Sequence, residues 1–504
     1  MSGKQSEQCL RKRVQGAHPG GSNVEEPPVH SRNAIRSSGA VVFRVFLRAI
    51  LGAAGAMLVS AASIAEQRPV GSAPPNAPPR RIQVNTLEDL PNPPAGKVSL
   101  RAALREANAS TADCVIVLSA PGTYRIANAE LGIRSGPRRV SIAAGGRPGI
   151  YVIAGDKKRR IFAVEKRAAL TLTNVEVTGG YSNAGGAIYN EGTVVLTGRT
   201  RVWGNTAVGS AAGDGGGGVF NSGTLILSES ASVTANKAVS EAKLGGGGGI
   251  LNNGTLTLNG ASLVSENTTT GEHGAGGGVF NNNGATMVLN DSSRVSSNCT
   301  SSRNYSYGGG GVFNNGELTL NDRSIIELNR SQSIGGGVAN WGTLALKNNS
   351  SVVGNHCRLD GGGVFNNSKV TMQDDSKLRE NVADTWGGGG IDNDGGTFVM
   401  NGHSKVVRNT SNRAGGVDNW HGTFTMNGHS SVSFNSAWES GGGGVQNDQG
   451  ATLILNDDSS ISQNKAPTGG GVYIAAGTAV FKINGRSAVS NNSGGDITRK
   501  QDPQ

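Results

Sequence analysis

Short runs of alternating apolar and polar residues recur along most of this chain, and asparagine and glycine bound each run. In residues 255–258, Thr-Leu-Thr-Leu, a period of two places Leu256 and Leu258 on one face of a strand and the threonines on the other. The equivalent inward-facing pairs are Leu225/Leu227, Leu318/Leu320, Leu344/Leu346, Phe398/Met400, Phe424/Met426 and Leu453/Leu455. No repeat contains a helical period long enough for a crossover helix, so the pattern predicts stacked β-strands.

A Gly-Gly-(Val/Ile) motif gives the period of these runs. Its apolar residues are Ile188, Val219, Ile250, Val279, Val312, Val338, Val364, Ile391, Val417, Val445 and Val472. Successive motifs lie 26 to 33 residues apart, which is typical of a solenoid. Since one coil cannot bury its own apolar face, stacked coils must share a core. We therefore predict an all-β fold, a single-stranded right-handed parallel β-helix.

Two asparagine positions recur once in each unit. The first column is Asn190, Asn221, Asn252, Asn281, Asn314, Asn340, Asn366, Asn393, Asn419 and Asn447, and the second is Asn205, Asn236, Asn267, Asn298, Asn329, Asn355, Asn381, Asn409, Asn435 and Asn464. Asparagine tolerates turn conformations and can hydrogen-bond to its copy in the next coil, so both columns predict amide ladders. The glycines are expected to supply positive φ angles and close backbone approach at the turns.

Composition divides the chain into five regions. They are a signal or leader region at 1–65, a Pro-rich linker at 66–81, an N-terminal cap with the first coils at 82–180, Gly/Asn-rich repeats at 181–495 and a polar tail at 496–504. The apolar stretch 49–65 follows several arginines and ends in small residues, Ser63 and Ala65, as a secretory signal does. We expect export, cleavage near Ala65 and no membrane span in the mature chain.

Three segments before the repeats carry a family resemblance. IQVNTLEDL at 82–90, VSLRAALREANAS at 98–110 and DCVIVLSAPGTYRI at 113–126 together resemble the start of bacterial secreted β-helix proteins with a CSLREA-type domain. Val98 stands where that family has cysteine, and Ala102 where it has glutamate. The resemblance implies a short capping helix, from Ser99 to Ala107, before the first coils.

The repeats are also similar to those of polymorphic outer-membrane proteins, which are adhesins. GGAIYN at 185–190 and the Asn-x-Ala endings at Asn205, Asn236 and Asn464 carry this second resemblance. It implies secretion or cell-surface placement in a bacterium and an adhesive role, for which a carbohydrate or another cell-surface ligand is the expected partner.

Charge argues against a nucleic-acid partner. Residues 181–504 hold 21 Lys/Arg against 24 Asp/Glu, so the net charge of +10 comes from the first 180 residues. A surface that follows a phosphate backbone needs a basic stripe, which the repeats lack. The basic run at 157–160, Lys-Lys-Arg-Arg, is interpreted as a solvated loop.

Two neighbouring units differ from the others in a way that could carry chemistry. Asp392 and Asp418 replace the usual apolar residue after the Val/Ile position, and His403 and His429 recur in an Asn-Gly-His-Ser turn. Stacking would place like groups on adjacent coils, where carboxylates perturb each other or share a cation. Duplication of one coil explains the same pattern without any activity. The intervening turn is expected to send aspartates and histidines to different sides, so these four residues are only candidate catalytic residues, and neither a metal site nor a cofactor is predicted.

Four tryptophans, Trp341, Trp386, Trp420 and Trp438, fall at corners or in loops, where exposed indoles can stack on sugar rings. Local packing of loop aromatics is the alternative. The sequence thus favours a binding or adhesin-like rod for glycans or another surface. Two alternatives stay open: a polysaccharide lyase or hydrolase on the same fold, and a structural surface component.

Overall fold

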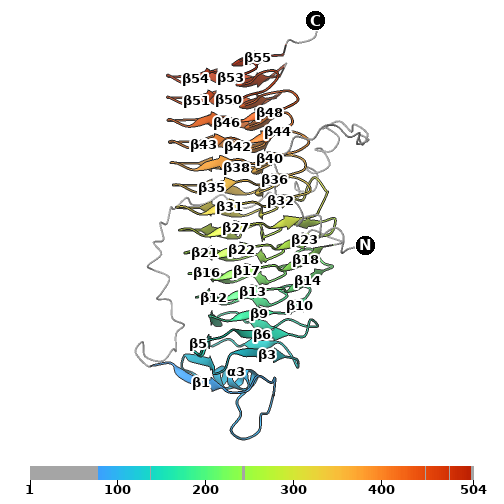
Figure 1. Cartoon of the computed structure of the whole chain (residues 1–504), viewed down its shortest axis with the longest axis vertical. Helices are drawn as coiled ribbons and strands as arrows, with labels where there is room; N and C mark the ends of the chain where they lie inside the picture. Colours follow the sequence, from blue (N-terminus) through green and yellow to red (C-terminus); the bar gives the residue numbers. More distant parts are fainter. Residues whose placement is uncertain (1–77, 137, 241–244, 449, 476, 501–504) are drawn as a thin grey trace, which may run out of the picture. The chain divides into compact units, whose positions relative to one another are not determined.

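The computed structural model describes residues 78–136, 138–240, 245–448, 450–475 and 477–500, which form a right-handed parallel β-helix of about 14 turns (Figure 1). The predicted fold class is confirmed. The predicted leader, residues 1–65, and residues 66–77 of the predicted linker lie outside the described residues. No helix among the described residues has the length and apolar character needed to cross a bilayer.

One coil in the middle of the repeats shows the architecture. It contains β29 (Val312–Asn314), β30 (Glu317–Leu320), β31 (Ile325–Glu327) and β32 (Arg330–Ser331), and each strand pairs in parallel with its copies in neighbouring coils. In the described part of the chain, the strands build four long sheets and one two-stranded sheet of β19 (Gly245–Gly246) and β24 (Gly274–Ala275). Sheet A has 15 strands from β1 (Arg80–Val84) to β53 (Val480–Ile483), sheet B has 14 from β3 (Gly122–Ile126) to β54 (Ala488–Ser490), sheet C has 14 from β4 (Leu131–Ile133) to β55 (Ile497–Arg499), and sheet D has 10 from β10 (Tyr181–Ser182) to β48 (Ser436–Ala437).

The hydrophobic pattern of the sequence does not reveal the strands of sheet D. These strands have only two to four residues, as in β32, and are too short to show an alternation. The eleven Val/Ile positions of the repeat motif each begin a strand of sheet C, as the common period requires.

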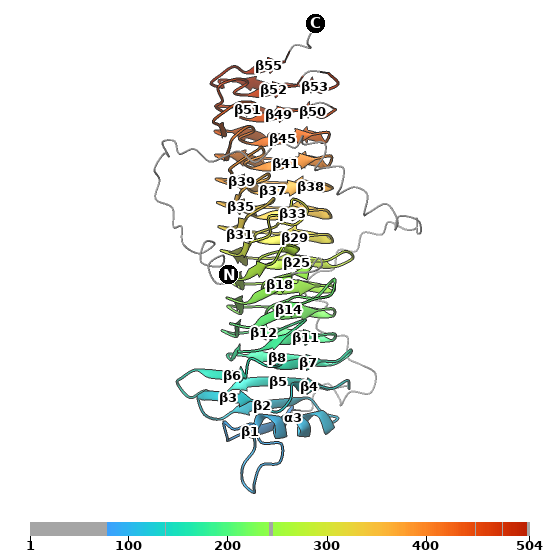
Figure 2. The same cartoon turned by 90° about the vertical axis from the view of Figure 1, so that its right-hand side faces the viewer.

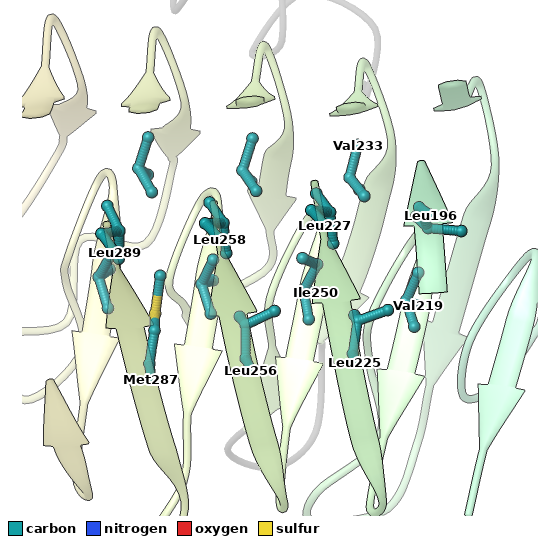
Figure 3. Packing of buried hydrophobic residues seen from close by; sticks show 14 of the residues in the cluster. Leu196, Val219, Leu225, Leu227, Val233, Ile250, Leu256, Leu258, Met287 and Leu289 are labelled. Atoms are coloured by element: carbon teal, nitrogen blue, oxygen red, sulfur yellow. The ribbon is translucent and has the colours of Figure 1, made fainter. Parts of the chain in front are cut away.

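A continuous apolar column fills the inside of the coils. Leu256 and Leu258 in β21 (Thr255–Leu258) are completely buried, whereas Thr255 is exposed, so the predicted facing is confirmed. Figure 3 shows Leu225, Leu256 and Met287 at one position on three successive coils. Sheets B and C add one inward residue per coil, such as Val264 and Val312.

Both predicted amide ladders are present. Asn281 donates its side-chain N–H to Asn314 Oδ1 at 2.8 Å, and Asn314 donates in turn to Asn340 at 2.7 Å. In the second ladder, Asn298 donates to Asn329 Oδ1 at 2.9 Å. These amides are buried, so the ladders satisfy polar groups that would otherwise destabilise every corner of the coil.

Each glycine in the run that precedes sheet C is needed for its own structural reason. Gly309 adopts φ +72°, a left-handed conformation that other residues rarely accept. A Cβ atom on Gly310 would lie 2.4 Å from the carbonyl oxygen of Gly336, and one on Gly311 would lie 2.9 Å from the side-chain nitrogen of Asn329. The run is needed because the chain turns from sheet D into sheet C with backbone against backbone.

A second apolar cluster lies outside the main column, and we call it the side layer. It is formed by the middle residues of successive sheet C strands and by the segments that lead into them. Its buried members are Leu251, Ala275, Phe280, Phe313, Ile334, Ala339 and Phe365, and the half-buried Phe220, Tyr305, Tyr307, Trp341 and Leu359 pack against them. The rings of Phe280 and Phe313 stack with centroids 4.9 Å apart. Outward-facing positions of sheet C are therefore buried here.

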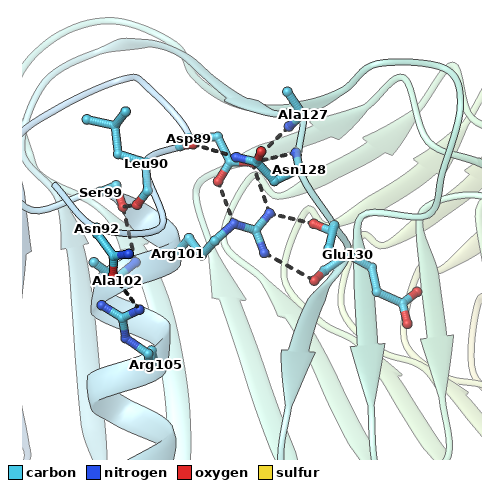
Figure 4. Close-up of polar contacts among 11 residues, drawn as sticks. Asp89, Leu90, Asn92, Ser99, Arg101, Ala102, Arg105, Ala127, Asn128 and Glu130 are labelled. Carbon is cyan, nitrogen blue, oxygen red and sulfur yellow. Dashed lines mark hydrogen bonds and ion pairs between the residues drawn. The ribbon is translucent and has the colours of Figure 1, made fainter.

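At the blue end of the β-helix, α3 (Leu100–Ala109) lies against β1, β2 (Cys114–Leu118) and β4 (Figure 2). Ser99 accepts the N–H of Ala102 at 3.1 Å as the N-cap. Arg101 forms an ion pair with Asp89 at 2.7 Å, and Asp89 also accepts the N–H groups of Ala127 and Asn128, each at 2.9 Å (Figure 4). This network joins α3 to the loops around it.

Candidate ligand-binding site

The two candidate aspartates lie side by side in the protein interior. Asp392 in β41 (Ile391–Asp394) pairs in register with Asp418 in β45 (Val417–Trp420), and both side chains are completely buried. The stacking of these like groups is as predicted. Phe365 precedes them in the same column and Gln446 follows, so they continue the side layer with polar residues. A polysaccharide has no access to either carboxylate.

A third buried carboxylate lies in the same layer. Asp360 accepts the N–H of Gly387 at 2.9 Å and the hydroxyl of Tyr305 at 3.2 Å. Tyr305 also contacts the ring of Phe365 edge-on, with centroids 5.9 Å apart. The acidic part of the side layer thus begins where its aromatic part ends.

The two candidate histidines lie elsewhere on the coil. His403 follows β42 (Thr397–Met400) and His429 follows β46 (Thr423–Met426), so a whole strand of sheet A separates each from the aspartate of its own unit. Their rings stack with centroids 5.1 Å apart, and both side chains are exposed. The structure stacks one aspartate on the other and one histidine on the other, but it does not bring an aspartate close to a histidine. No group of three or more His, Cys, Asp or Glu side chains within the described ranges is arranged to hold a metal ion.

The four tryptophans do not form one surface. Trp341 packs between Phe313 and Phe365, with centroids 4.9 and 5.3 Å away, so both faces of its indole are occupied. Trp386 and Trp420 are half-buried beside Tyr305 and His421 respectively. Trp438 alone among the four is exposed, with 49% of its surface accessible.

The structure shows a different concave site, which sequence reasoning missed. A depression of about 460 Å³ lies where sheet D begins, at β10 and its neighbour β14 (Thr206–Gly209). The coil below turns from β6 (Tyr151–Gly155) to β7 (Phe162–Val164) without a sheet D strand, and this change leaves a step on the surface. We call it the step site; its lining residues are Glu130, Lys158, Arg159, Arg160, Tyr181, Ser182, Asn183 and Val208.

Arg160 forms the floor of the step site and is held from several sides. Its guanidinium pairs with Glu130 at 3.0 Å and donates to Ser182 Oγ and to the Ala184 carbonyl, both at 2.9 Å. It also lies over the Tyr189 ring, 4.8 Å from the centroid. Burial raises the pKa of Tyr189, so this ring stays neutral and apolar beneath the cation. Arg160 is thus a structural cation with little freedom to move.

Several other lining residues expose groups to solvent that a ligand could contact. Tyr181 is 40% exposed and Val208 39%, which gives the site an apolar surface. Lys158 and Asn183 are exposed, and Arg159 makes a 3.4 Å ion pair with Asp156 at 37% side-chain exposure. An aromatic face beside amide and cationic donors can bind a planar or ring-shaped polar ligand that carries negative charge.

Comparison with protein-family models, curated proteins and solved structures finds no match to this chain. The fold is established by the strand pairing, and the two family resemblances rest on their sequence motifs. The Lys-Lys-Arg-Arg run at 157–160 was a signal for the step site, but the sequence alone does not show that Tyr181 and Val208, more than twenty residues later, lie above it.

Proposed function

We propose that this protein is a secreted or cell-surface bacterial β-helical rod that binds an acidic glycan at the step site. The observation that carries the proposal is the exposed Tyr181 ring beside Lys158 and Arg159 in a depression of the surface. The adhesin-like resemblance of the repeats supports the same class of function.

The step site suits a sugar that carries a carboxylate or a sulfate group. The apolar face of a pyranose ring can stack on Tyr181, as sugars do on exposed aromatic rings. Three cations line the depression against Glu130, with Asp156 paired to Arg159 at the edge, so the site retains a net positive charge. Arginine binds planar anions such as carboxylates through two parallel hydrogen bonds.

The fold keeps the site preorganised. Tyr181 donates its backbone N–H to the Arg159 carbonyl at 2.9 Å, which joins β10 to the coil below. Arg160 is fixed by Glu130 and by the backbone, so binding orders few side chains and loses little entropy. Placement at the cell surface is supported by the apolar segment 49–65, which lies outside the described residues. Intact-mass measurement of the secreted product would show cleavage near Ala65.

The test is binding of the full chain to an array of uronate-containing, sulfated and neutral glycans. We expect acidic glycans to be retained and retention to fall as salt rises, since ionic contacts are screened. Tyr181→Ala should weaken binding by about tenfold or more, from the loss of about 1.5 kcal/mol of ring contact. Trp438→Ala is the matched control, because it removes an exposed aromatic ring elsewhere and should leave binding unchanged.

Each part of the proposal can fail separately. Failure to retain any glycan would refute the function, whereas loss of binding in Trp438→Ala but not in Tyr181→Ala would refute only the site. The Asp392→Asn/Asp418→Asn variant should keep all binding, because both side chains are buried away from the surface. Release of unsaturated or reducing sugar ends that disappears in this double variant would favour the lyase or hydrolase alternative.

A further inference from the structure

Five successive coils bring a column of carboxylate, imidazole and guanidinium side chains to one turn of the β-helix. The turn joins sheet A to sheet B, and its equivalent residues are Asp375, His403, His429, Asp458 and Arg486. Backbone hydrogen bonds fix the register: the N–H of His403 donates to the Asp374 carbonyl at 2.9 Å, and the N–H of His429 to the Gly402 carbonyl at 2.8 Å. The two imidazoles are therefore neighbours because the coils are stacked.

We propose that His403 and His429 form an open two-imidazole site for a divalent transition-metal ion of the nickel, copper and zinc group. Imidazole nitrogen is a preferred ligand of these ions. Two nitrogens bound to one tetrahedral ion lie roughly 3.4 Å apart for bonds of about 2.05 Å. In this structure the rings lie face to face, with centroids 5.1 Å apart and planes 16° from parallel, so both exposed side chains must turn until their in-plane nitrogen lone pairs converge on one ion.

Asp458 lies beside the second histidine and would hydrogen-bond to its ring when the ion binds. Its carboxylate lies 3.9 Å from Nδ1 of His429 and is held by Arg486 at 2.7 Å. A carboxylate on one ring nitrogen fixes a metal-bound histidine and leaves the other nitrogen to face the ion. His429 would therefore bind through Nε2, and Asp458 is a positioning residue.

The proposed site is open, since the protein supplies two nitrogens and water fills the other positions. The described residues contain no cluster of three His, Cys, Asp or Glu groups that could hold a metal, so the ion is expected to exchange readily and to take further ligands from solution. This inference does not rest on the step site or on glycan binding.

The test uses the full chain after treatment with EDTA and dialysis. Paramagnetic resonance with Cu²⁺ counts bound nitrogens directly, and titration calorimetry with Ni²⁺ and Zn²⁺ gives affinities. We expect coupling to two imidazole nitrogens in the wild type and to one in His403→Ala or His429→Ala, with this binding lost in the double variant. Asp458→Asn should weaken binding by about tenfold without changing the nitrogen count.

The matched control is His273→Ala/His356→Ala, which removes the same number of imidazoles at other places. His273 contacts the ring of Tyr307, and His356 pairs with Asp384 at 2.7 Å. This control should keep the two-nitrogen signal. Unchanged affinity in His403→Ala/His429→Ala, or equal loss in the control, would overturn the proposal, as would a wild-type signal from one nitrogen only. Circular dichroism should show that each variant is folded.

Discussion

The side layer has an apolar half and an acidic half built on the same backbone. From β20 (Ile250–Asn252) to β37 (Val364–Asn366), the middle residue of each sheet C strand is Leu, Phe or Ala. From β41 to β49 (Val445–Asn447), it is Asp392, Asp418 and Gln446. All of these side chains are buried, and across the boundary the main column stays apolar and the asparagine ladders continue.

This difference shows that the two interiors of the coil are under different constraints. The main column must be apolar, because every coil closes around it. The side layer is covered by only one further segment per coil and accepts carboxylates where backbone N–H and hydroxyl donors are present, as they are around Asp360. The sequence can therefore vary at this position without loss of the fold.

The largest expected effect tests whether the main column is the same in both halves. Leu256→Asp and Met400→Asp should each reduce stability by about 4 kcal/mol, since each places an unpaired charge among buried side chains. The half-buried, outward Thr257 and Val399 are the controls, and their change to Asp should cost less than about 1 kcal/mol. The free energy of local opening, measured by hydrogen exchange, gives the loss of stability in each variant. A much smaller loss for Met400→Asp would mean that the acidic half packs loosely throughout.

The second prediction contrasts the two halves of the side layer directly. Phe313→Ala should cost about 3 kcal/mol, because it leaves a cavity among stacked aromatic rings. Asp418→Asn should change stability by less than about 1 kcal/mol and in the favourable direction, since it removes repulsion between carboxylates on adjacent strands. Hydrogen exchange of the backbone amides in β29 and β45 measures the change in stability that each substitution causes. Strong destabilisation by Asp418→Asn would show that the negative charge itself is required.

The third prediction concerns the ladder shared by both halves. Asn314→Ala and Asn419→Ala should each cost about 2 kcal/mol, because each leaves a buried amide on both neighbouring coils without its partner. Urea unfolding midpoints should fall equally for the two variants. Unequal losses would indicate that the side layer alters the corner next to it.

The last prediction compares the stacked carboxylates with one that has a known cation. Burial alone would raise the pKa of Asp89, but hydrogen bonds from Arg101 and from the backbone of Asn128 and Ala127 lower it below 3.8 overall. A lowered pKa means that Asp89 stabilises the fold above pH 3.8 and loses this effect as the pH falls through its folded value.

Asp89→Asn should therefore reduce stability by about 2 kcal/mol at pH 7 and make unfolding less sensitive to acid below pH 3.8. Thermal unfolding between pH 2 and pH 7 follows both effects. Asp113→Asn, at a carboxylate that accepts the backbone N–H of Arg139 at 2.8 Å, is the comparison near the same end. The same acid sensitivity in Asp89→Asn and wild type would show that Asp89 is not the group that titrates.

Much of the fold was predictable because it repeats. The period, the facing of Leu256 and Leu258, and the ladders at Asn314 and Asn329 follow from residues that recur at fixed positions. The candidate site was much less predictable. Alternation distinguishes the residues that face the main column from those that face away from it. Asp392 and Trp341 face away from the main column, yet other segments cover them. The step site lies between coils of different shape, so the repeat pattern does not predict it.

The sequence by itself determined which residues fill the main column and which asparagines stack, because stacking converts a spacing of 26 to 33 residues along the chain into contact in space. Only the tertiary structure decided which outward positions are buried, since burial depends on whether the segment between sheets D and C folds over them. It also decided that Tyr181 meets Lys158 and Arg159 at the start of sheet D. This contact joins different parts of the coil, which the common period does not specify.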